Sequence, residues 1–157
     1  MSHALQRLVD ARSIEPFAAH DDEIVGRWRV AVGAFHDARR VQTVEMRVSV
    51  CYQAGLQAAI TLVRNAGYRV RSAPGGHHYV AFATLSALDE PALSRVGEEM
   101  NRLRRRRHDA VYDWREPGEA DELNPEQLER VVSELLAIGY GVLVRSRPAV
   151  AAVLARP

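Results

Sequence analysis

Residues 44–67 read VEMRVSVCYQAGLQAAITLVRNAG and contain the longest strongly apolar region of the chain. Apolar side chains recur there on most sides of a helix, among a run of alanines: Val48, Cys51, Leu56, Ile60 and Val63. A helix that is apolar nearly all round is buried by its neighbours. We therefore expect this helix to end at Gly67 and to lie at the centre of the fold, with other helices packed around it.

Helical spacing of apolar residues predicts further helices on both sides of this one. The predicted segments are 22–41, a short helix over 77–85, a long helix over 89–114, and 125–138. Asn124 followed by Pro125 and Gln127 is an N-cap signal that starts the last helix, and Gly139 with Gly141 is expected to end it. The sequence thus predicts an all-α fold, an up-and-down bundle of four main helices plus short helical segments.

The chain divides into three predicted parts. Residues 1–21 form an N-terminal segment with a short helix, residues 22–144 form the helical bundle, and residues 145–157 form a C-terminal tail. Residues 69–76 are rich in Gly, Ser and Pro and read as a surface loop. Residues 142–144 are either a short strand or a continued turn.

Composition limits the class of protein. The chain has 157 residues, 47% of them apolar, and a net charge of +1, which indicates one soluble domain with a core of its own. A single cysteine and the lack of a long unbroken apolar stretch favour a cytoplasmic protein without a signal peptide or membrane span. All 21 basic residues are arginine. Because the net charge is near zero, any phosphate site should be local.

The histidines and the cysteine predict no metal site and no cofactor. They include no His-Glu-x-x-His or Cys-x-x-Cys spacing, and residues 74–76 lack the lysine of a phosphate-binding P-loop. Cys51 lies inside the most apolar helix and reads as a small core residue. His77 and His78 follow two glycines, where they either begin a helix or contact phosphate.

Residues 100–114, MNRLRRRRHDAVYDW, carry an anomaly. In helical projection Arg107 lies near the centre of an apolar stripe made by Leu93, Val96, Met100, Leu103, Val111 and Trp114. Burying an unpaired guanidinium would cost several kcal/mol, a large part of the stability of a small domain. We therefore expect Arg107 to pair with an acid such as Glu98 or Glu99, or to line a cleft or a subunit interface.

The neighbours of Arg107 suggest chemistry at this cleft. His108 and Tyr112 lie one turn apart on the same face, with Arg104 and Arg105 close behind. An imidazole, a phenol and guanidinium groups could therefore converge on one substrate, and guanidinium binds phosphate in a bidentate manner. The alternative interpretation is a charged helix face that is exposed to solvent.

The same segment resembles the motif of the HEPN superfamily (higher eukaryotes and prokaryotes nucleotide-binding). Members carry an arginine, a polar residue, three further residues, a histidine and often an aromatic residue two positions later. Arg107, His108, Tyr112 and Trp114 match those positions, with His108 in place of the usual asparagine and Tyr112 in place of the histidine. An apolar second helix, a loop and a short helix led by His77 fit the family layout, and the resemblance covers about residues 22–140.

The resemblance implies a homodimer whose paired motif helices form a cleft, and in many members a metal-independent RNase. An imidazole then moves the proton of the ribose 2′-hydroxyl, and arginine stabilises the charge on phosphate. Imidazole titrates at about 6.5 and phenol near 10, so His108 suits this role better than Tyr112. In a second register Arg102 and His108 satisfy the looser family pattern, with Arg102 or Arg107 holding the phosphate.

The sequence therefore predicts binding of RNA or nucleotide phosphate through Arg104, Arg105, His77 and His78, and cleavage by a toxin- or defence-type endoribonuclease through Arg107, His108, Tyr112 and Arg102. The resemblance also implies an antitoxin partner, either nucleotidyltransferase-like or a small acidic protein. The alternatives are a non-catalytic interaction or nucleotide-binding module of the same fold, and a regulator that binds a ligand between its helices.

Overall fold

A computed structural model describes residues 2–71, 76–112 and 123–157, and for residues 107–112 it describes the backbone only. Helices make up most of the described chain. They are α1 (His3–Asp10), α2 (Asp21–Ala38), α3 (Val44–Asn65), α4 (His77–Ala87), α5 (Pro91–Tyr112), α6 (Pro125–Ser146) and the 3-10 helix η1 (Pro148–Val153). Two short strands, β1 (Ile14–Pro16) and β2 (Tyr68–Val70), complete the described elements.

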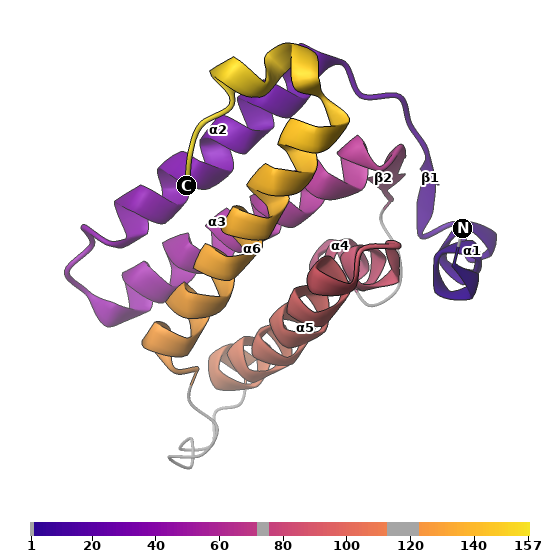
Figure 1. The fold of residues 1–157 in the computed structure, drawn as a ribbon. Helices are drawn as coiled ribbons and strands as arrows, with labels where there is room; N and C mark the ends of the chain where they lie inside the picture. The colour runs from indigo at the N-terminus through magenta and orange to yellow at the C-terminus, as the bar shows by residue number, and fades with distance from the viewer. Residues whose placement is uncertain (1, 72–75, 113–122) are drawn as a thin grey trace.

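The four long helices alternate in direction along the chain. In Figure 1, α2 and α5 run one way and α3 and α6 run the opposite way. α3 packs against α2, α4 and α6, while α5 packs against α4 and α6. The predicted all-α bundle is thus confirmed, with α4 bridging α3 and α5.

The central position predicted for residues 44–67 is confirmed. α3 is buried along most of its length after Cys51, and the fully buried Tyr52 and Leu62 lie on it. A Cβ on Gly55 would lie 2.8 Å from Cε of Met100 on α5 and 3.0 Å from Cγ2 of Val132 on α6. The missing side chain at Gly55 therefore lets three helices meet at one point.

The predicted end of the last helix is wrong, because α6 continues through both glycines to Ser146. Gly139 is buried, and a Cβ there would lie 2.9 Å from Cη2 of Trp28 and 3.0 Å from Cδ1 of Leu62. The glycine is thus explained by the close approach of α2 and α3, and it does not terminate the helix.

The N-terminal segment contains the predicted short helix α1, and Ser2 caps it by accepting a hydrogen bond from the amide of Leu5 at 3.1 Å. The predicted loop over 69–76 is wrong in its first residues, because β2 pairs there antiparallel with β1, with Ile14 opposite Val70. Two strands of three residues are too short to show an alternating pattern in the sequence.

The C-terminal tail packs on the bundle. Trp28 donates a hydrogen bond from Nε1 to the carbonyl oxygen of Ala155 at 2.8 Å, and Leu154 is buried. Arg147 donates to Asp21 and to Asn65, which ties the end of α6 to the start of α2 and the end of α3. In the described ranges no helix is both long enough and apolar enough to cross a membrane.

Candidate functional site at the α4–α5 hairpin

The predicted site residues come from two helices that form an antiparallel hairpin. α4 ends at Ala87 and α5 begins at Pro91, so the connection is short. A Cβ on Gly97 of α5 would lie 2.6 Å from Oγ of Ser86 and 3.0 Å from the carbonyl oxygen of Phe82, which shows how closely α4 approaches. This α4–α5 hairpin places the start of α4 beside the C-terminal half of α5.

The apolar stripe of α5 is present in the described residues. Leu93, Val96, Met100 and Leu103 are each no more than 1% exposed. Arg107 follows Leu103 by four residues, and its backbone, like those of His108 and Tyr112, belongs to α5. The side chains of these three residues lie outside the described part of the structure, so their roles stay predictions.

Four arginines of α5 form what we call the arginine surface: Arg102, Arg104, Arg105 and Arg106. Arg102, Arg105 and Arg106 are exposed, whereas Arg104 is half-buried. The guanidinium carbon of Arg104 lies 5.5 Å from the centre of the Tyr79 ring on α4. Its Nε atom is buried and has no hydrogen-bond partner among the described residues.

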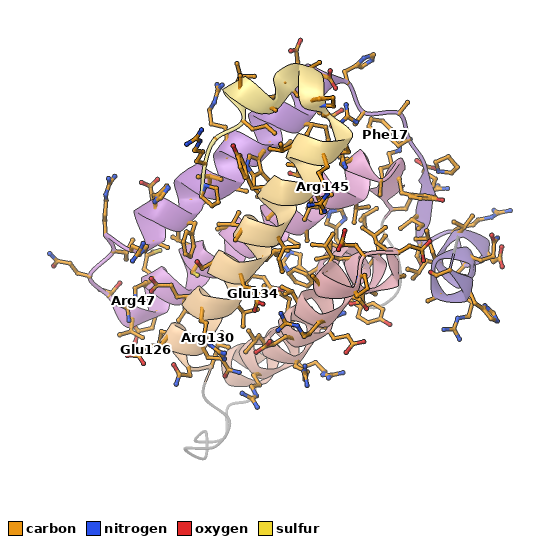
Figure 2. All side chains as sticks on the ribbon, in the orientation of Figure 1. Phe17, Arg47, Glu126, Arg130, Glu134 and Arg145 are labelled. Atoms are coloured by element: carbon orange, nitrogen blue, oxygen red, sulfur yellow. The ribbon has the colours of Figure 1, made fainter. Side chains whose placement is uncertain are left out.

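The arginine surface has few internal partners. No described carboxylate forms an ion pair with Arg102, Arg104 or Arg105, and Arg106 donates only to the side-chain oxygen of Gln127, at 3.4 Å. Glu99, which the sequence offers as a partner for Arg107, pairs with Arg130 of α6 at 3.8 Å. Glu134 and Arg130 lie along α6, the helix that packs against α5 (Figure 2).

The two histidines at the start of α4 differ in their surroundings. His77 is exposed, and Gly76 precedes it with a φ of +86°, a backbone conformation that glycine tolerates best. His78 is half-buried, and its Nδ1 lies 3.3 Å from the hydroxyl oxygen of Tyr52 on α3. His77 thus remains open to a ligand at this end of the hairpin, while His78 connects α4 to the core.

Tyr79 is the residue of this region that the sequence analysis missed. It lies on α4 directly after the two histidines and is 42% exposed. The sequence gives only a weak indication that Tyr79 is functional, because an aromatic residue next to apolar helix residues is usually part of the core. Its contact with Arg104 joins residues that are 25 positions apart, and it depends on the fold of the hairpin.

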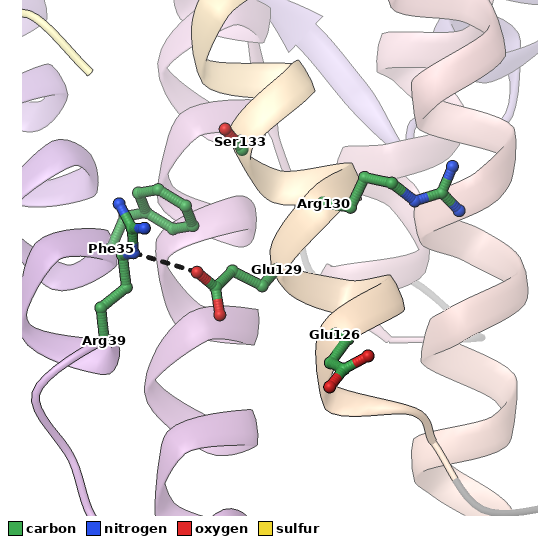
Figure 3. Close-up of a pocket in the computed structure, with 6 residues that line it drawn as sticks. All are labelled: Phe35, Arg39, Glu126, Glu129, Arg130 and Ser133. Carbon is green, nitrogen blue, oxygen red and sulfur yellow. Dashed lines mark ion pairs between the residues drawn. The ribbon is translucent and has the colours of Figure 1, made fainter.

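The described pockets lie elsewhere. A pocket of about 380 Å³ between α2 and α6 is lined by Phe35, Arg39, Glu126, Glu129, Arg130 and Ser133 (Figure 3). Its charges are largely paired, because Arg39 binds Glu129 at 3.0 Å and the Arg130 side chain extends toward Glu99 of α5. A second, more apolar pocket of about 320 Å³ lies near the turn between α4 and α5. Neither pocket is lined by a predicted site residue.

Two other kinds of site find no support in the described residues. Burial raises the pKa of Cys51 to about 12, with a further increase from Glu129 that outweighs the opposite effect of Arg47, so its thiol is protonated at neutral pH. In the described part of the chain, no three histidine, cysteine or acidic side chains gather as metal ligands.

Comparisons of the chain with models of protein families, with curated proteins and with solved structures gave no match.

Proposed function

We propose that this protein is a HEPN-like domain that binds RNA through the arginine surface of α5. The observation that supports binding is the group of arginines without carboxylate partners in the described structure, on a chain whose net charge is only +1. Elsewhere on the same helix Arg95 is paired with Glu134. A positive surface that the protein does not neutralise itself is available to an anionic ligand.

The chemistry of guanidinium favours a phosphate-bearing polymer as that ligand. Arg102 lies three residues before Arg105 and four before Arg106, so all three share one exposed side of the helix. Each planar guanidinium can donate two parallel hydrogen bonds to phosphate oxygens. An open row of such groups, away from the described pockets, suits a chain with repeated phosphates better than a small enclosed ligand.

The proposal extends to metal-independent cleavage, and its support is the motif in the sequence. His108 would take the proton of a ribose 2′-hydroxyl, whose oxygen then attacks the neighbouring phosphorus. The bond from phosphorus to the 5′-oxygen breaks, and the leaving oxygen takes a proton from a protonated imidazole. Arg107, or Arg102 in the second register, would hold the phosphate oxygens while negative charge develops.

The resemblance adds partners and a setting to the proposal. A second copy of the chain would pair its α5 with the first, so that two sets of motif residues face one cleft. A toxin or defence role in the bacterial cytoplasm would also require an antitoxin, either nucleotidyltransferase-like or a small acidic protein. The arginine surface would attract an acidic partner by charge complementarity.

The binding part of the proposal is tested with a matched pair of double variants. Arg102→Ala combined with Arg105→Ala should weaken RNA binding by about 10- to 100-fold at moderate salt. It should also flatten the dependence of log K on log salt by about 2, because two phosphate contacts are lost. The measurement is fluorescence anisotropy with labelled RNA over a series of salt concentrations.

Arg29→Ala combined with Arg156→Ala is the control for this experiment. Both arginines are exposed, form no ion pair with a described carboxylate, and lie outside the hairpin. The control removes the same net charge but leaves the arginine surface intact, so it should keep most of the affinity for RNA. An equal loss in the two double variants would show that binding follows net charge alone, and the proposed site would be wrong.

The cleavage part is tested by incubating the protein with total RNA and EDTA. His108→Ala should abolish cleavage while RNA binding persists, because only the proton-transferring group is removed. Tyr112→Phe distinguishes the registers: loss of activity in this variant as well would assign a role to the phenol. Intact RNA with the unaltered protein would contradict cleavage and leave a non-catalytic RNA-binding module.

A further inference from the structure

Tyr79 is an aromatic ring presented at the edge of the arginine surface. It is the most exposed of the described Phe, Trp and Tyr side chains, at 42%. The residues that follow it, Val80 and Phe82, are buried and hold α4 in the core. Tyr79 is therefore placed by a helix that is held in the core, while the residue itself is exposed to solvent.

Arg104 contacts this ring from the neighbouring helix. Its guanidinium carbon lies 5.5 Å from the ring centre, within the range of a cation–π interaction. This contact joins α4 to α5 and holds a planar cation beside an aromatic ring. No described carboxylate competes for the guanidinium.

Unpartnered polar atoms gather at the same place. In the described chain three buried side-chain nitrogen or oxygen atoms have no hydrogen-bond partner: Oδ1 of Asn101, Nε of Arg104 and Nε of Arg64. Arg64 is already paired with Glu23 through another of its nitrogens. Asn101 and Arg104 lie one turn apart on α5. Because buried polar atoms are normally hydrogen-bonded, these two atoms show that polar groups of this turn of α5 lack partners within the described fold.

We infer that Tyr79 and Arg104 form a stacking platform for an unpaired nucleobase, so that the arginine surface selects single-stranded RNA over duplex RNA. The inference rests on the proposed function and specifies its substrate class. A single strand can turn a base outward onto an aromatic ring or a guanidinium plane, while the arginines contact its phosphates. In a duplex the bases are stacked on one another, and only the backbone and the groove edges are accessible.

The platform is tested with three RNA probes and two substitutions at one position. The probes are an oligouridine of about 12 nucleotides, the same strand with its central bases removed, and a duplex of equal length. Tyr79→Leu keeps a branched apolar side chain but removes the aromatic face. Tyr79→Phe keeps the face and loses only the hydroxyl, so it is the matched control.

The unaltered protein should bind the oligouridine more tightly than the duplex. Tyr79→Leu should weaken oligouridine binding by about 5- to 100-fold, the loss expected for one stacked base. It should leave binding of the base-free strand and of the duplex unchanged, and Tyr79→Phe should bind all three probes like the unaltered protein. Circular dichroism spectra and thermal unfolding verify that both variants fold.

Two other results separate the inference from the function on which it rests. Equal binding of all three probes by the unaltered protein and by Tyr79→Leu would overturn the platform and leave RNA binding intact. An equal loss for the base-free strand in Tyr79→Leu would also overturn it, because the effect would then not depend on bases. Failure of the unaltered protein to bind any probe would contradict the proposed function itself.

Discussion

The two halves of α5 share one packing face and differ in how their charges are used. In the first half, Arg95 pairs with Glu134 and Glu99 pairs with Arg130, both across to α6. In the second half, Arg102 and Arg105 find no described carboxylate. The apolar stripe runs through both halves without a break as far as Leu103. Packing thus fixes the position of the whole helix, and the acidic and basic residues of α6 determine which charges of α5 are paired within the fold.

This difference separates structural charges from charges available to a ligand. An exposed ion pair contributes little stability, so the pairs of the first half serve mainly to match α5 to α6. The arginines of the second half form no such ion pairs within the described fold, and four neighbouring arginines repel one another. A repulsion retained on an otherwise neutral protein is explained if an anion relieves it.

The largest effect we expect tests whether the second half is as firmly packed as the first. Leu93 and Leu103 lie ten residues apart on the stripe, and each is 1% exposed. Leu93→Ala and Leu103→Ala should each lower the free energy of unfolding by about 2–5 kcal/mol, because each leaves a cavity in the core. Urea denaturation measures both losses. A loss below about 1 kcal/mol for Leu103→Ala alone would mean that the second half is loosely held, since truncation of a packed leucine costs more than that.

The sequence predicts this stripe because helix packing repeats every three to four residues, a pattern that needs no knowledge of the partner helix. Local signals also locate the start of α6. The side chain of Asn124 accepts hydrogen bonds from the amides of Glu126 and Gln127, at 2.9 and 3.2 Å, as the N-cap pattern predicts. These features depend on neighbours in the chain, so the residues themselves reveal them.

Features that depend on distant residues were not predictable in the same way. Gly139 reads as a helix end, yet its role is to admit the ring of Trp28, which lies more than a hundred residues earlier. The arginine run is visible in the sequence, but which of its members lack acidic partners depends on the position of α6. Tyr79 became a candidate only through its contact with Arg104, a consequence of how α4 folds back on α5.

The smallest effect we expect is also the most direct test of the two halves, because the same type of substitution should lower Tm in the first half and should not lower it in the second. Arg95→Ala removes the hydrogen bond and ion pair with Glu134, which raise the pKa of Arg95, and should lower Tm slightly. Arg102→Ala removes one of several mutually repelling charges and should leave Tm unchanged or raise it. Both shifts should shrink between low salt and about 1 M salt, where exposed charges are screened. A similar fall in Tm for the two variants would imply that Arg102 has a stabilising partner in the fold, and a paired Arg102 would not be available to phosphate.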